Sequence, residues 1–182
     1  RKNIKRLVNR EIENAKKGKN ARIMAKMNSL VDPELVNLLY KASKAGVKID
    51  LIIRGMCCLY PGQKDLSENI QVISIIGRFL EHSRVFWFAN DKKPEVYIGS
   101  ADWMRRNLDR RVEAVTPIED PNLKIKLKNL LEIYLKDNIG AWVMQPDGSF
   151  LKKSSHAEKS CSQTYLIDSW HEKELIRQKQ KN

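Results

Sequence analysis

Histidine and arginine stand close together in one short segment, a combination that suits chemistry on phosphate groups. His82 is followed two residues later by Arg84, and the apolar run 85–88 begins at once. If both residues belong to that strand their side chains share a face, because strand side chains alternate between faces. An imidazole can act as a nucleophile or proton carrier, and a guanidinium offers a planar fork of donors to phosphate oxygens. A lone histidine is more often structural, but here its neighbours favour a phosphate site.

Small residues with a hydroxyl follow a second apolar run and could line the same site. The segment 99–102 (GSAD) comes directly after the run 96–98, and its small side chains permit close approach of a ligand. Its spacing from His82 resembles the HxK…GS motif of the phospholipase D fold. The match is partial, because Arg84 takes the place of the lysine and Asp102 stands where that superfamily has asparagine.

The formal net charge of +12 first suggests a polyanion as the partner. Residues 1–20 carry eight basic and two acidic side chains, and residues 151–182 carry seven and four. The body, residues 21–150, carries 19 and 16, so most of the excess lies at the two ends, as is typical of solvated helices and tails. Within the body the arginines are clustered and could form a local phosphate site: Arg78, Arg84, Arg105, Arg106, Arg110 and Arg111.

Composition excludes several classes of protein. No apolar run approaches the roughly 20 residues that a membrane-spanning helix needs. The three cysteines form no CxxC pair and are interpreted as reduced cytosolic thiols. His156 and His171 lie far from His82, so no zinc site and no other metal site within this chain is expected. The chain begins with Arg1 rather than Met and lacks the apolar core of a secretory signal, so we expect a piece of a longer protein.

Hydrophobic spacing predicts an alternating order of strands and helices. Residues 1–19 have apolar side chains at helical spacing and are expected to form an amphipathic linking helix. A strand at 22–28 precedes a helix at 32–46, with Asp32 as its N-cap, and a buried strand follows at 47–54. This order implies a right-handed crossover and a largely parallel sheet, with ligand sites at the strand ends.

The second half of the chain is predicted to add strands and one more helix. Short strands are expected at 72–75, 85–88, 96–98 and 112–115, the middle two joined as a hairpin. A helix is expected at 120–136 and an edge strand at 141–144. The chain is thus divided into the linking helix, one domain at 20–150, and a polar, loosely attached tail at 151–182.

Longer strings resemble the C-terminal end of bacterial polyphosphate kinase. They are ARIMAKMNSLVD (21–32), AGVKIDLIIRGMCCLYPG (45–62), SENIQV (67–72), RFLEHSRVFWF (78–88) and YIGSADWMRRNLDRRVEAVTPI (97–118). The resemblance covers about residues 20–150, and SADWM…RNLDRRVE is an idiosyncratic string. The chain departs from the family where Arg105 or Arg106 occupies a position that is usually proline, which would loosen that turn and add positive charge.

The resemblance implies an α/β fold, a phospholipase D-like mixed sheet flanked by helices. It implies an intact enzyme that reversibly transfers the terminal phosphate of ATP to the end of a polyphosphate chain with Mg²⁺, whose ligands lie upstream of this chain. Two phospholipase D-like halves would each give one histidine to a shared tunnel. His82 would be the second histidine, and the histidine that becomes phosphorylated would lie before Arg1. The family's nucleotide-contacting arginine falls on Arg54, and an arginine that approaches the phosphates falls on Arg111. By itself the chain is not expected to be a competent kinase.

Each of these arginines also has a structural alternative. Arg54 could form a strand-end salt bridge with Asp50 or Asp109. Arg111 could pair with Glu113 or Asp109. Residues of second rank for phosphate binding are Lys26, Arg84, Ser100, Asn107 and Arg110.

Two other classes of function are alternatives to the kinase. A phospholipase D-like phosphodiesterase or nuclease could form if two copies paired their histidines, and the missing lysine of HxK argues against it. A non-catalytic module could bind polyanions through the basic ends, but this leaves the phosphate-site strings unexplained.

For the kinase, the implied partners are ATP or ADP, polyphosphate, the first catalytic half of the same chain, and further copies in a homo-oligomer. No specific nucleic acid is expected. The expected location is the cytoplasm, with a peripheral place at the inner membrane face as a variant.

Overall fold

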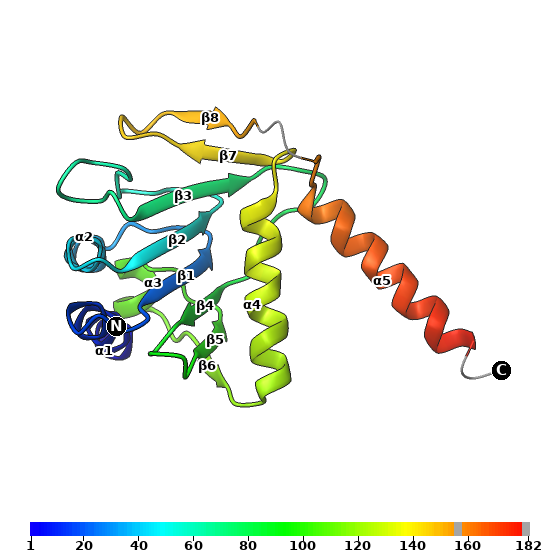
Figure 1. Ribbon diagram of the computed structural model, residues 1–182, viewed down its shortest axis with the longest axis horizontal. Coiled ribbons are helices and arrows are strands. Elements are labelled where there is room, and N and C mark those ends of the chain that lie inside the picture. The colour runs from blue at the N-terminus through cyan, green and yellow to red at the C-terminus, as the bar shows by residue number, and fades with distance from the viewer. Residues whose placement is uncertain (155–157, 180–182) are drawn as a thin grey trace.

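A mixed sheet organises the part of the chain that the computed structural model describes, residues 1–154 and 158–179. Its strands are β1 (Arg22–Met27), β2 (Lys48–Ile53), β3 (Ile70–Ile75), β4 (Val85–Phe88), β5 (Glu95–Gly99), β6 (Val115–Ile118), β7 (Ala141–Met144) and β8 (Phe150–Lys152). The helices are α1 (Lys2–Lys16), α2 (Pro33–Lys44), α3 (Arg105–Arg110), α4 (Pro121–Lys136) and α5 (Ser162–Lys179). The strand order is β6-β5-β4-β1-β2-β3-β7-β8 (Figure 1).

The predicted crossover from β1 through α2 to β2 is confirmed. Asp32 caps α2 by accepting a hydrogen bond from the Leu35 amide at 3.0 Å. Pro33 occupies the first turn, where the missing backbone donor costs nothing. β1 and β2 are parallel, with Ile23 opposite Ile49, and β3 continues the parallel arrangement. The segments that follow β1 and β2 therefore leave the sheet at the same edge.

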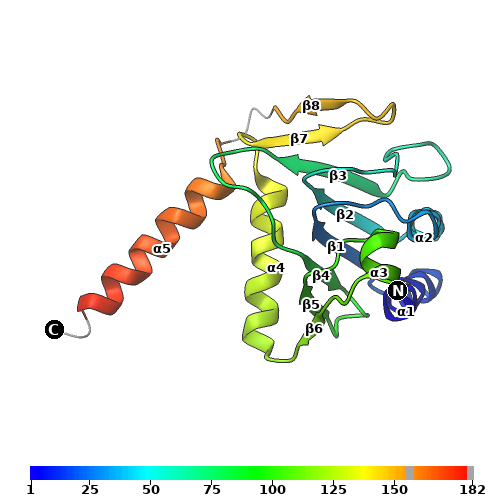
Figure 2. The same ribbon diagram turned by 180° about the vertical axis from the view of Figure 1, so that it is seen from behind.

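Helices cover both faces of the sheet. α1 and α2 lie on one face and α4 lies on the other (Figures 1 and 2). The alternation of β1 places Ile23 and Ala25 in the apolar cluster with α1 and α2, and Met24 in the cluster with α4. Lys26 shares the α4 face, because its ammonium lies 5.0 Å from the ring centroid of Tyr134 in α4. A charged side chain is thus placed inside an otherwise apolar layer.

The hairpin of β4 and β5 is confirmed, but the strand expected next is displaced along the chain. β6 begins at Val115 rather than at residue 112, and Val115 lies opposite Gly99. A Cβ atom at Gly99 would stand 2.4 Å from the Ala114 carbonyl oxygen, so this close approach of the two backbones requires glycine. Val112, at which the strand was predicted to begin, is fully exposed and lies outside β6.

The C-terminal part of the chain differs most from expectation. β7 is not an edge strand, because β8 pairs with it on the outer side, with Trp142 opposite Lys152. The expectation of a loosely attached tail is wrong at the start of α5, where Ser162 is buried. Its amide and its hydroxyl both donate to Asp137 Oδ2, at 2.7 and 2.6 Å. Beyond this anchor α5 projects away from the sheet (Figure 1). Among the described residues, no helix is long and apolar enough to cross a membrane.

Candidate phosphate-binding site

One edge of the sheet collects most of the residues singled out in the sequence. Asn28 follows β1 and Arg54 follows β2 at the edge where these parallel strands end. β4 is antiparallel to β1, with Val85 opposite Lys26, so the segment before β4, which contains His82, reaches the same edge. β5 runs antiparallel to β4 and brings Asp102 back to it. Residues far apart in the chain therefore meet because of strand direction.

Asp102 lies at the centre of this cluster and is buried. Arg84 donates to it through two nitrogens, Nε to Oδ1 at 3.2 Å and Nη2 to Oδ2 at 3.1 Å. Asn28 donates to Oδ1 through its backbone amide at 2.7 Å and through its side chain at 3.2 Å. A bidentate arginine–carboxylate pair fixes the guanidinium plane, so Arg84 is oriented as well as neutralised.

Arg54 keeps its positive charge unpaired within the described part of the chain. Its Nε donates to Asn28 Oδ1 at 3.0 Å, and its side chain is otherwise exposed. The two carboxylates considered as structural partners are used elsewhere: Asp50 pairs with Arg22 at 2.8 Å, and Asp109 pairs with Arg1 at 2.6 Å. The salt-bridge alternative for Arg54 is therefore not realised.

His82 lies at the surface beside Arg84. Arg84 Nη1 is 3.2 Å from His82 Nδ1 and donates to the His82 carbonyl oxygen at 3.0 Å. The same Nη1 is 3.5 Å from His82 Nε2, so the guanidinium lies close to both nitrogens of the ring. The exposed imidazole can form a hydrogen bond with an oxygen of a bound group.

Lys26 is not at the surface, although the sequence made it a phosphate-binding candidate. Its ammonium is buried and lies 3.1 Å from Glu81 Oε2 and 2.9 Å from Ser83 Oγ. Burial lowers the pKa of Lys26, the Glu81 carboxylate opposes that change, and the positive charges of Arg54 and Arg84 add to it. Burial and the neighbouring Glu81 carboxylate raise the pKa of Tyr134. The charge of Lys26 is thus used inside the protein.

Ser100 and Asn107 are engaged with a neighbouring carboxylate. Both side chains donate to Glu113, and the Ser100 hydroxyl also accepts from the Ala114 amide at 3.2 Å. The hydrogen bonds from Ser100 and Asn107 lower the pKa of Glu113, with the charges of Arg111 and Arg84 as smaller causes. Glu113 is therefore a half-buried, charged neighbour of the cluster.

Arg110, the last residue of α3, and Arg111, which follows it, both have exposed side chains. Within residues 1–154 and 158–179 neither forms an ion pair, and Asp109 is taken by Arg1. The predicted alternative partner Glu113 forms no ion pair with Arg111, whose charge only helps to lower the pKa of that carboxylate. Arg111 is thus available to an anion that reaches this side of the cluster.

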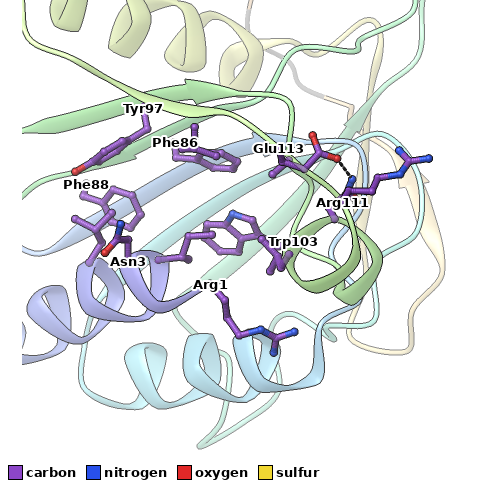
Figure 3. A pocket seen from close by; sticks show the side chains of 14 residues that line it. Arg1, Asn3, Phe86, Phe88, Tyr97, Trp103, Arg111 and Glu113 are labelled. Atoms are coloured by element: carbon purple, nitrogen blue, oxygen red, sulfur yellow. Dashed lines mark hydrogen bonds between the residues drawn. The ribbon is translucent and has the colours of Figure 1, made fainter.

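A cavity of about 290 Å³ lies next to Arg111, between α1, α3 and the sheet (Figure 3). Its walls are largely apolar and include four aromatic side chains, of which Phe86 stacks on Trp103 with ring centroids 5.4 Å apart. The polar side chains at its rim include Arg1, Arg111 and Glu113. The side chains of Arg54 and His82 do not line it. Its chemistry suits an apolar group, whereas the Arg54 edge suits an anion.

The side chains at the candidate site do not fit a resident Mg²⁺ ion. Among the described residues, no three His, Cys, Asp or Glu side chains are grouped to hold a metal. The carboxylate oxygens of Asp102 already accept from Arg84 and Asn28, whereas Mg²⁺ requires oxygen ligands in near-octahedral geometry. His171 is exposed on α5, and His156 lies outside the described residues.

Three residues that shape the site were missed in the sequence. Asn28 ends the predicted strand 22–28 and was given no role, yet it joins Arg54 to Asp102. Glu81 and Gln163 hold the segment before β4, with Gln163 Nε2 donating to Glu81 Oε1 at 2.8 Å. Gln163 lies 82 residues after Glu81 in a stretch without an apolar period, so no local signal marked it.

Comparison with known proteins shows the family of the chain. Residues 1–164 match the family model described as polyphosphate kinase C-terminal domain 2. The chain is 62% identical over 172 residues to a polyphosphate kinase of Parasynechococcus marenigrum, which covers 93% of this chain and 24% of that protein. A polyphosphate kinase 1 of Chlorobaculum tepidum is 54% identical over 163 residues, covering 90% of this chain and 23% of that protein.

Solved structures give the same result. The crystal structure of polyphosphate kinase from Porphyromonas gingivalis superposes with a TM-score of 0.92 and 41% identity, covering 96% of this chain and 27% of that chain. NucT from Helicobacter pylori superposes with a TM-score of 0.52 at 14% identity, over 72% of this chain and 89% of that one, which shows a shared fold only.

The fold is the mixed α/β sheet flanked by helices that a phospholipase D-like domain was expected to have. The chain belongs to the polyphosphate kinase family, and the part of the family that it matches is C-terminal domain 2. It spans about a quarter of the length of the relatives it matches.

Proposed function

We propose that this chain supplies the second half of a polyphosphate kinase active site and binds phosphate groups at the edge formed by Arg54, His82 and Arg84. The observation that carries the proposal is Arg54, an exposed cation that is held by a neutral amide and has no carboxylate partner among the described residues. A guanidinium in that state can neutralise phosphate oxygens without first breaking an ion pair. The family to which the chain belongs supports ATP and polyphosphate as the substrates.

In the proposed reaction, the bond between the terminal phosphorus of ATP and its bridging oxygen breaks and ADP leaves. The phosphoryl group is first taken by a histidine nitrogen outside this chain, as the family resemblance implies. The terminal oxygen of polyphosphate then attacks the phosphorus, the bond to nitrogen breaks, and the polymer is one phosphate longer. Charge spreads over the phosphoryl oxygens during each transfer, so fixed cations accelerate it.

Each residue at the edge has a separate part in this scheme. Arg54 would bind the phosphates through the nitrogens that Asn28 does not use. His82 would donate a proton from its exposed ring to an oxygen of the transferred or leaving group. Asp102 would hold Arg84 and would not touch the substrate. No step is assigned to a metal ligand from this chain, because the carboxylates here are already engaged.

Titration of the chain with ADP and with tripolyphosphate tests this assignment. Arg54→Gln should weaken tripolyphosphate binding about 10- to 100-fold, the range expected for a charge-assisted hydrogen bond. Arg6→Gln, which removes the same charge from an exposed position on α1, is the matched control and should change binding far less. Equal effects of the two substitutions would mean that only overall charge is sensed.

The phosphodiesterase alternative has a feature against it. The residue at the position of the HxK lysine is Arg84, and its guanidinium is committed to Asp102. A bis(p-nitrophenyl) phosphate assay separates the two functions. We expect no hydrolysis above background, whereas turnover that disappears in His82→Ala would favour the phosphodiesterase.

A further inference from the structure

The segment that carries His82 is held from two sides by residues outside it. Glu81 precedes His82 and is buried, and its two carboxylate oxygens bind different elements. Oε2 lies 3.1 Å from Lys26 Nζ in β1, and Oε1 accepts from Gln163 Nε2 in α5 at 2.8 Å. Ser83 follows His82, and its hydroxyl accepts from Lys26 Nζ at 2.9 Å. Both neighbours of the exposed histidine are therefore anchored.

Gln163 makes a second attachment to the same segment. Its Oε1 accepts from the Phe79 amide at 3.0 Å, and its Nε2 donates to the Phe79 carbonyl oxygen at 2.9 Å. A side-chain amide that pairs with both backbone groups of one residue replaces the ladder partner that this segment lacks. Gln163 is buried, so water competes little for these bonds.

Gly77 provides an independent sign that this contact is specific. A Cβ atom at Gly77 would stand 2.5 Å from Gln163 Oε1 and 3.0 Å from its Cδ. The backbone at Gly77 does not have a positive φ, so glycine is not needed there for its conformation. Its role is to leave room for the Gln163 amide.

We propose that Gln163 and Lys26 are positioning residues for His82, forming a clamp through Glu81 that holds residues 79–83 against the sheet. This inference rests on the proposed function, because it concerns how His82 is presented to phosphate. Neither residue touches the substrate. Lys26 holds the segment from β1, Gln163 holds it from α5, and His82 extends to solvent between Glu81 and Ser83.

The clamp gives the start of α5 a part in the site. Ser162, the residue before Gln163, is fixed by two hydrogen bonds to Asp137, which follows α4. Gln163 is thus carried on an anchored backbone rather than on a mobile end. A residue more than 80 positions after His82 in the chain then limits how far the histidine segment can move.

A double-mutant cycle on Gly77 and Gln163 tests the clamp in this chain. The first readout is the NMR order parameter of the backbone at residues 79–83, with Thr164→Ala, an exposed neighbour of Gln163, as the control. In the wild type and in the control we expect about 0.85, the value of rigid backbone. In Gln163→Ala and in Gly77→Ala we expect values below about 0.6. The combined variant should be no more mobile than Gln163→Ala, because the added methyl group then has nothing to displace.

The second readout is the shift of the His82 ring resonances on titration with tripolyphosphate. If the segment occupies its binding conformation for about a tenth of the time, the apparent Kd should rise about tenfold in Gln163→Ala. A packing role alone would leave this Kd unchanged once the variant is folded.

Two results would overturn the clamp: order parameters in Gln163→Ala equal to those in Thr164→Ala, or an effect of Gly77→Ala that persists in full without Gln163. Absence of any His82 response in the wild type would contradict the proposed function itself. The backbone cycle would still decide the clamp in that case.

Discussion

Arg54 and Asn28 are joined by a hydrogen bond of 3.0 Å between Nε and Oδ1, and the acceptor is a neutral amide. The same amide group donates to Asp102, which in turn holds Arg84. The charge of Asp102 thus neutralises Arg84, whereas Arg54 is oriented by an amide that does not neutralise it. One arginine of the edge serves the architecture and the other is left for an anion.

Asp102→Asn is expected to loosen the edge without removing a phosphate contact. The variant keeps the size of the side chain but loses the charge that pairs with Arg84, and an amide nitrogen would face a guanidinium or the Asn28 amide. We expect destabilisation of about 3 kcal/mol, the lower range for breaking a buried ion pair. Chemical denaturation measures this, and an unchanged free energy of unfolding would mean that Asp102 does not hold Arg84 in solution.

Asp137 predicts how stability depends on pH. Burial raises the pKa of Asp137, but hydrogen bonds from Ser162, Gly140 and Ile139 outweigh it, so the folded-state pKa lies below the ordinary value. The resulting stabilisation is present above the unfolded pKa, near 3.9, and is lost as pH falls through the folded-state pKa. Asp137→Asn should lower stability at neutral pH by about 1–3 kcal/mol and flatten the acid limb of the stability profile. Urea unfolding at pH 7 and in the acid range measures both, and an unchanged acid limb would assign that dependence to other carboxylates.

Binding of polyphosphate to this chain should depend strongly on salt. Exposed basic residues of the N-terminal segment, such as Lys2, Arg6 and Lys17, act through solvent, and such interactions are screened within about 10 Å at 0.1 M salt. We expect the Kd for a long polyphosphate to rise about tenfold or more between 0.05 and 0.3 M salt. Titration at the two ionic strengths is the measurement. An affinity that does not change with salt would mean that binding does not depend on screened electrostatic interactions.

The sequence was informative where a local signal existed. Asp32 and Pro33 marked the start of α2, and the His82 and Arg84 pair marked the edge of the sheet. The burial of Lys26 could not be predicted, because it depends on the ion pair with Glu81, which comes from a distant part of the chain. Gln163 could not be found, because its role depends on tertiary contacts with Phe79 and Glu81.

The chain alone is expected to show no ATP-dependent synthesis of polyphosphate. It spans about a quarter of the relatives it matches, and within its described residues a single histidine, His82, lies at the Arg54 edge. Incubation with ATP and magnesium, followed by gel analysis of the products, measures this. Sustained growth of polyphosphate chains would contradict the division of the active site between two halves.

The central claim is that His82 acts on phosphate, and the most direct measurement uses a chimera in which this chain replaces the matching segment of the Parasynechococcus marenigrum polyphosphate kinase. His82→Ala should lower kcat for polyphosphate synthesis by about 10²- to 10⁴-fold, the range for a lost proton-transfer group. His171→Ala, which removes an exposed histidine from α5, should leave kcat unchanged. A folded His82→Ala chimera with the same kcat as His171→Ala would show that His82 is structural and would contradict the account.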